Sequence, residues 1–282
     1  MTAANNALFP LPPGATSSVV SSIRQAARAT NVDFGLLMAQ AQQESGFRPD
    51  ARASGSSAAG LYQFIDSTWL SLVQRFGAKY GVGSYAQKIV TDSTGRATVA
   101  DPGDRRHILD LRTDPRLSAS LAAEYAKLNK GEIEQALGRS ATNAELYMAH
   151  FLGAGGATTF LKALRSNGSA VAADLLPEAA AANRTVFYDP SGRARTVGEI
   201  FRSYADRIER DAHQFAASAG GDAPAISASA GGAPGFAQSL GFTGKELTAP
   251  LAAMLDIFAV SALKLLSDAP SPPPPGLVRR AL

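Results

Sequence analysis

The stretch AQAQQESGF, residues 39–47, places one acidic side chain at the end of an apolar helix face. Leu37 and Ala41 belong to a run of apolar residues with helical spacing, and continuing that spacing leads to Glu44. Gly46 stands two residues further on and is a typical helix stop. The sequence therefore predicts a helix whose last turn holds Glu44 at the margin of the core.

This position of Glu44 allows two interpretations. A carboxyl group at the end of an apolar face is partly removed from water, which disfavours its charged form. A carboxyl group that stays protonated near neutral pH can serve as a general acid. Most glutamates in a last helical turn are solvated instead. The choice between the two depends on the residues that follow.

Composition limits the class of protein. The chain has 282 residues, 45% hydrophobic and 18% charged, enough for one core of up to about 200 residues with appendages. The net charge of +3 suits an anionic polymer as partner but falls short of a nucleic-acid footprint. Cysteine is absent, and His107, His150 and His213 show no ligand spacing. We therefore predict no metal and no cofactor.

Hydrophobic periodicity predicts a mainly α fold. The helix that carries Glu44 is expected to begin at Asp33 as its N-cap. Asp66 or Ser67 should cap a later helix, and Thr196 the last one. The other helical patterns lie at about 18–30, 67–76, 115–130, 131–138, 142–151, 157–166, 175–183 and 197–208. No run alternates as a strand would.

Composition also divides the chain into segments. Residues 1–16 are predicted to form an irregular leader and lack the features of a standard signal peptide. Residues 17–213 carry the helical patterns of one domain. Residues 214–245 are predicted as a flexible Ala/Gly/Ser/Pro linker, 246–267 as an apolar helix and 268–282 as a proline-rich tail. The proline and charges inside 246–267 argue against a membrane-spanning helix.

Three segments resemble motifs of one enzyme family. They are Glu44-Ser45, GLYQ at residues 60–63, and YMAHFLGAGG at residues 147–156. The soluble lytic transglycosylase (SLT) family carries, in this order, a Glu-Ser pair, a Gly-Leu-Met-Gln-like segment and an Ala-Tyr-Asn-Ala-Gly segment. The resemblance covers about residues 18–210. It implies a goose-type, lysozyme-like catalytic domain over 17–213, followed by the linker and the C-terminal helix.

The resemblance also implies a reaction, which is cleavage of the β-1,4 bond between N-acetylmuramic acid and N-acetylglucosamine in peptidoglycan glycan strands. Glu44 matches the family's single catalytic acid. That acid protonates the leaving oxygen and then accepts a proton from the C6 hydroxyl of the muramic residue or from water. The first route leaves 1,6-anhydro ends, and the second is hydrolysis by a muramidase. Support from the substrate's own acetamido group explains why one carboxylate suffices.

Two loop residues are implied as substrate-binding. Ser54 precedes Gln63 by nine residues, as does the family's loop serine that supports the acetamido group. Gln63 matches the sugar-contacting amide, with the alternative that it ties down its own loop. Ser45 is equally well explained by a local helix-end hydrogen bond. The nearest other carboxylates, Asp50 and Asp66, have turn and capping explanations, so no second carboxylate is assigned.

The third segment departs from the family pattern. His150 stands where the family has tyrosine, and Phe151 where it has asparagine. His150 either replaces that tyrosine beside Glu44 as a substrate-site residue or is a buried, structural histidine. Tyr188 is the candidate for the family's closing tyrosine, whereas Tyr147 is expected in the core.

Three functions stay open at this point. The first is a lytic transglycosylase, the second a hydrolytic muramidase. The third is a peptidoglycan-binding scaffold of an envelope or secretion complex. The apolar segment 246–267 could bind such a complex or a membrane surface, or could pack back on the domain. The substrate implies the periplasm or cell envelope, by an export route that the leader does not identify.

Overall fold

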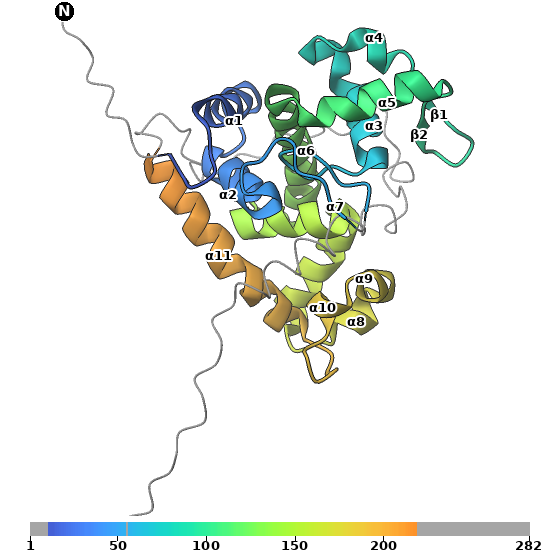
Figure 1. Ribbon diagram of the computed structural model, residues 1–282. Coiled ribbons are helices and arrows are strands. Elements are labelled where there is room, and N and C mark those ends of the chain that lie inside the picture. Colours follow the sequence, from blue (N-terminus) through green and yellow to red (C-terminus); the bar gives the residue numbers. More distant parts are fainter. Residues whose placement is uncertain (1–10, 55, 219–282) are drawn as a thin grey trace, which may run out of the picture.

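A computed structural model describes residues 11–54 and 56–218 (Figure 1). The predicted apolar helix 246–267 and the tail 268–282 lie outside these residues. So does most of the predicted linker. The mainly α fold expected from periodicity is confirmed for the part of the chain that the structure describes.

Helices make up nearly all of the regular structure. Two short strands, β1 (Val90–Thr91) and β2 (Ala97–Thr98), pair antiparallel. The helices are α1 (Ser17–Thr30), α2 (Phe34–Ser45), α3 (Asp66–Phe76), η1 (Gly77–Tyr80), α4 (Gly83–Ala86), α5 (Pro102–Asp110), η2 (Leu111–Thr113), α6 (Pro115–Leu137), α7 (Asn143–Asn167), α8 (Ala172–Leu175), α9 (Pro177–Ala182), α10 (Arg184–Phe187) and α11 (Val197–Ser218).

The ends of α2 agree with the prediction from its local sequence. Asp33 Oδ1 accepts a hydrogen bond from the Leu36 backbone N–H at 2.7 Å, as an N-cap does. Gly46 follows Ser45 in the left-handed conformation, and its N–H bonds back to the Gln42 carbonyl oxygen at 2.9 Å. The helix that carries Glu44 therefore has a fixed start and a fixed end.

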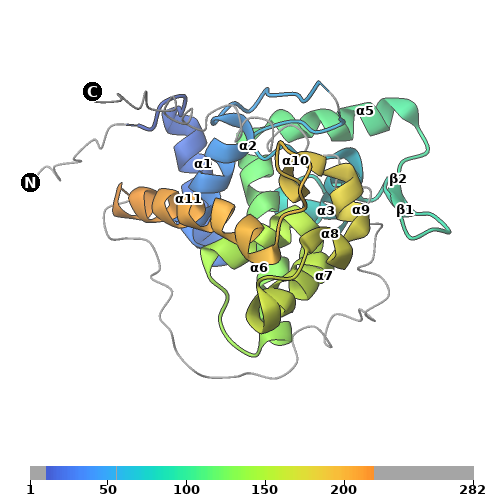
Figure 2. The ribbon, with the colours of Figure 1, turned by 90° about the horizontal axis from the view of Figure 1, so that it is seen from below.

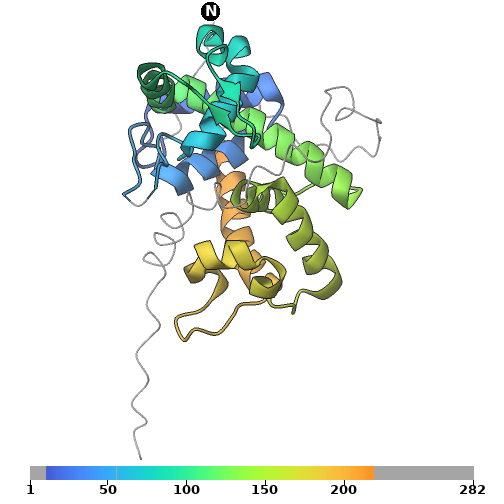
Figure 3. The same ribbon diagram turned by 90° about the vertical axis from the view of Figure 1, so that its right-hand side faces the viewer.

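Four helices surround the one that ends in Glu44. Helix α11 packs along α2 and α7, and α6 packs against α1 and α7 (Figures 1 and 2). A Cβ atom on Gly35 would lie 2.2 Å from the Ala212 carbonyl oxygen, so only glycine permits this approach of α11 to α2. The segments α3–α5 and α8–α10 lie toward opposite ends of the molecule (Figure 3). Helix α11 thus lies along both α2 and α7.

Several helix boundaries differ from the prediction. The patterns at 115–130 and 131–138 form one helix, α6, which continues through Gly131. The patterns at 142–151 and 157–166 form α7, which kinks at Gly153 (φ 68°, ψ 161°), a conformation favourable only for glycine. The pattern at 175–183 is divided between α8 and α9. Helix α11 continues to Ser218, past the boundary predicted at 213.

The expected capping role of Asp66 is wrong. Ile65 occupies the N-cap position of α3 and makes no side-chain capping bond. The Asp66 carboxylate, in the first turn of α3, instead binds Arg105 Nη2 at 2.7 Å and Arg112 Nη1 at 2.9 Å. Both arginines lie more than thirty residues from Asp66 in the sequence. Local capping preference has been overridden by a tertiary ion pair.

Arg112 fastens the loop between α2 and α3 from inside. Its side chain is only 5% exposed. Besides Asp66, its Nη1 donates to the carbonyl oxygens of Ser57 (2.7 Å) and Phe64 (3.0 Å), and its Nε donates to that of Leu109 (2.8 Å). One buried guanidinium thus satisfies two backbone carbonyl groups of a loop that has little regular structure of its own, and a third in α5.

We expect Arg112→Ala to lower the free energy of unfolding by about 3–5 kcal/mol, because it removes the buried cation beside Asp66 and leaves three backbone carbonyl groups without their donor. Arg105→Ala removes the more exposed partner of the same carboxylate and should cost about 1 kcal/mol or less. Urea denaturation of both variants measures the difference. Equal losses would contradict the role given to Arg112.

Candidate functional site

Glu44, at the end of α2, faces His150 of α7. The His150 Nε2 and Glu44 Oε1 atoms are 3.5 Å apart. The Glu44 side chain has no exposed surface, and the His150 side chain is 7% exposed. The structure therefore brings together the acid and the histidine of two motifs more than one hundred residues apart, and it places both in the interior.

Two aromatic rings lie against His150. Its ring centroid lies 6.3 Å from that of Tyr125 on α6 and 6.2 Å from that of Tyr147 on α7. Tyr204 of α11 continues the cluster, with ring centroids 5.8 Å from Tyr147 and from Phe151. Phe151, where the family has asparagine, thus joins the cluster through Tyr204.

The charge of Glu44 contributes to the raised pKa values of two of these tyrosines, Tyr147 and Tyr204. Burial raises the pKa of Tyr147 well above its ordinary value, and the Glu44 carboxylate adds to the effect. Burial raises the pKa of Tyr204 to about 12, with Glu44 again adding and Arg195 opposing. Both phenols therefore stay protonated near neutral pH and can donate hydrogen bonds.

Tyr147 has a second unusual property. It is buried, as expected for a core residue, but its hydroxyl group has no hydrogen-bond partner among the described residues. A buried hydroxyl without a partner is costly. Sequence reasoning missed the relation of Tyr147 and Tyr204 to Glu44. The spacing of Tyr147, one turn before His150, was a usable signal, whereas Tyr204 looks like an ordinary member of the apolar face of α11.

The loop residue Gln63 is held by its own backbone surroundings. Gln63 is buried with a positive φ of 47°. Its Nε2 donates to the carbonyl oxygens of Gly60 at 2.8 Å and Ala51 at 3.2 Å. These bonds use both amide hydrogens, so Oε1 is the atom left for a sugar. The alternative role considered for Gln63, tying down its loop, is thus present in the structure.

Ser45 joins the end of α2 to the same loop. Its Oγ lies 2.8 Å from the Leu61 carbonyl oxygen, to which it donates, and accepts from the Arg48 N–H at 3.1 Å. These hydrogen bonds give Ser45 a structural role. They also fix the position of Gln63 relative to the helix that carries Glu44.

The two remaining predicted site residues, Ser54 and Tyr188, have their contacts elsewhere. Ser54 is exposed on the loop. Tyr188 is half-buried, pairs with Ala194 in a β-bridge, and has the Arg184 guanidinium 4.9 Å from its ring centroid. Within residues 11–54 and 56–218, neither makes a hydrogen bond or ring contact to Glu44 or His150.

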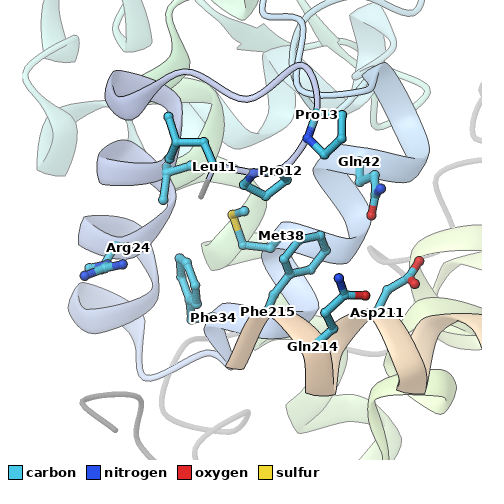
Figure 4. A pocket seen from close by; sticks show the side chains of 11 residues that line it. Leu11, Pro12, Pro13, Arg24, Phe34, Met38, Gln42, Asp211, Gln214 and Phe215 are labelled. Carbon is cyan, nitrogen blue, oxygen red and sulfur yellow. The ribbon is translucent and has the colours of Figure 1, made fainter. Parts of the chain in front are cut away.

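A cavity of about 370 Å³ lies at a different place, beneath the N-terminal segment (Figure 4). Leu11, Phe34 and Met38 contribute apolar surface, and Phe215 of α11 closes one side. Neither Glu44 nor His150 lines it. The cavity is therefore separate from the candidate catalytic pair.

Residues 11–54 and 56–218 contain no cluster of three or more side chains arranged to bind a metal ion. None of their helices combines the length and hydropathy needed to cross a membrane.

The chain matches the family model described as "Transglycosylase SLT domain" over residues 21–169, more than half of its length. The match includes Glu44, Gln63 and His150 and ends just after α7. This confirms the family that the three sequence motifs resemble, and its domain is lysozyme-like. The chain belongs to the transglycosylase SLT-domain family and is a peptidoglycan-degrading enzyme of that type.

Proposed function

We propose that the chain is a lytic transglycosylase that cleaves the β-1,4 bond between N-acetylmuramic acid and N-acetylglucosamine, with Glu44 as its only catalytic carboxyl group. The observation that carries this proposal is the buried Glu44 beside His150 at the junction of α2 and α7. The family match supports the substrate class. The reaction implies a protein of the periplasm or cell envelope.

The reaction needs one acid that later acts as a base. Glu44 gives its proton to the glycosidic oxygen as the bond from C1 of the muramic residue to that oxygen breaks. The C6 hydroxyl oxygen then bonds to C1, and its proton returns to Glu44. The products are a free hydroxyl on N-acetylglucosamine and a 1,6-anhydro ring, and no water is consumed. Glu44 ends in the protonation state in which it began.

One observation favours the internal hydroxyl over water as the acceptor. The carboxylate of Asp66, one of the two nearest to Glu44 in sequence, is already engaged by Arg105 and Arg112, which leaves it unsuited to position a hydrolytic water. The second candidate, a muramidase, needs such a water. The Glu44 side chain itself is fully covered. Both reactions require a covering side chain to shift before a sugar reaches Glu44.

The substrate contacts proposed from the family pattern lie on two segments. On the loop between α2 and α3, Gln63 offers its Oε1 as an acceptor for a sugar N–H or hydroxyl, and Ser54 supports the acetamido group. On α10 and its extension, Tyr188 offers an aromatic face beside Arg184. We assign binding of peptidoglycan strands to these residues and catalysis to Glu44. Binding of an envelope or secretion complex through 246–267 remains a proposal from sequence.

We expect Glu44→Gln to lower the rate of cleavage of purified peptidoglycan by about 100-fold or more, because the amide cannot supply the proton. Mass spectrometry of the soluble products should find 1,6-anhydro ends from the unchanged protein only. Glu124→Gln is the matched control. Glu124 is also buried, but it accepts from Lys79 and Tyr80, and its replacement should keep the activity.

Three results would contradict the proposal in different ways. Undiminished cleavage by Glu44→Gln would exclude Glu44 as the acid. Reducing ends without anhydro ends would replace the transglycosylase by a muramidase. Binding to peptidoglycan without any cleavage by the folded, unchanged protein would support the scaffold.

We expect Gln63→Met to lower the free energy of unfolding by about 1–3 kcal/mol, because methionine keeps the side-chain length but cannot donate to the carbonyl groups of Ala51 and Gly60. Ser54→Ala, on the exposed part of the same loop, should leave stability unchanged. Thermal unfolding followed by circular dichroism compares the two variants. An unchanged midpoint for Gln63→Met would show that these loop bonds contribute little.

A further inference from the structure

His150 approaches Glu44 from the opposite helix, with its ring held on two sides. Tyr125 of α6 meets the ring nearly edge to face, with an interplanar angle of 66°. Tyr147 of α7 lies against it at 37°. These contacts limit rotation of the imidazole and direct Nε2 toward Glu44 Oε1 at 3.5 Å. The histidine thus has a fixed relation to one particular oxygen of the acid.

The other titratable groups that face the pair do not change charge in the working pH range. They are Tyr125 from α6, Tyr147 from α7 and Tyr204 from α11. Burial raises the pKa of each phenol. Arg195 and Arg207 are the cations whose charges act on Tyr204 and Tyr147. None of the three phenols therefore loses its proton near neutral pH.

We propose that His150 is the positioning residue of the catalytic acid, holding Glu44 Oε1 through its Nε2–H so that the transferable proton stays on Oε2. This inference rests on the proposed function of Glu44. A neutral imidazole with hydrogen on Nε2 can donate to Oε1 in both states of the acid. In the protonated acid Oε1 is the carbonyl oxygen, and in the carboxylate it carries part of the charge. The carboxyl group therefore keeps one orientation through both proton transfers.

A histidine in this position makes the reaction sensitive to acid. An imidazolium beside Glu44 stabilises the carboxylate formed after the first transfer, and that carboxylate is then a weaker base toward the C6 hydroxyl. Loss of the shared proton at high pH removes the acid. The rate should therefore fall on both sides of an optimum. A non-titrating donor in place of His150 should leave only the alkaline fall.

Two variants separate positioning from packing in the full-length protein. His150→Gln places an amide N–H near the position of Nε2 but cannot become charged. We expect it to retain kcat at its optimum within about tenfold and to lose the acid-side fall, since the amide N–H can also donate to Glu44 Oε1. His150→Met fills similar space without a donor. We expect it to lower kcat by a further factor of about 10.

The pH profile of kcat on purified peptidoglycan is the kinetic measurement. Equal losses in both variants with an unchanged profile shape would mean a structural role and overturn the proposal. If His150 had only a structural role, its replacement would not change whether kcat falls on the acid or the alkaline side of the pH profile.

A measurement without substrate separates failure of this inference from failure of the proposed function. Nuclear magnetic resonance of isotope-labelled histidine, with the His150 signal assigned from its absence in His150→Gln, reports the tautomer. We expect hydrogen on Nε2 at neutral pH and a changed His150 titration in Glu44→Gln. Hydrogen on Nδ1 alone, or a titration indifferent to Glu44→Gln, would overturn the positioning role whether or not peptidoglycan is cleaved.

Discussion

Keeping one carboxyl group out of water is the constraint on which the site depends. A buried acid is tolerable only where partners surround it. Helix α2 ends by holding Glu44 in the interior, and α7 supplies His150 opposite it. Tyr204 comes from α11, which approaches α2 closely only because Gly35 has no side chain. The approach of α11 to α2 therefore also brings Tyr204 within reach of the charge of Glu44.

The loop after α2 has an irregular backbone, and side-chain hydrogen bonds hold it in a defined shape. Arg112 donates to its carbonyl groups from one side. Gln63 does so from within the loop, and Ser45 ties it to the end of α2. Residues that would contact a sugar therefore sit on a loop anchored to the helix of the acid. Binding and acid catalysis share the same support.

Local signals in the sequence were sufficient for the central helix and for the family. Asp33 and Gly46 marked both ends of α2, and the order of the three motifs identified the SLT domain. What depended on tertiary contacts was missed. Asp66 has an ordinary capping position in sequence, but its arginine partners lie on distant segments. Tyr204 follows the apolar period of α11, and no periodic pattern reveals that it lies within reach of the charge of Glu44.

In the proposed reaction Glu44 returns to its starting state by taking a proton from the sugar itself. Digestion of peptidoglycan in water enriched in heavy oxygen tests this step, because the two possible acceptors deliver different oxygen atoms to C1. We expect muramic ends that carry no heavy oxygen, since the C6 hydroxyl closes the anhydro ring. One heavy oxygen atom at each new muramic end would contradict it and make water the acceptor.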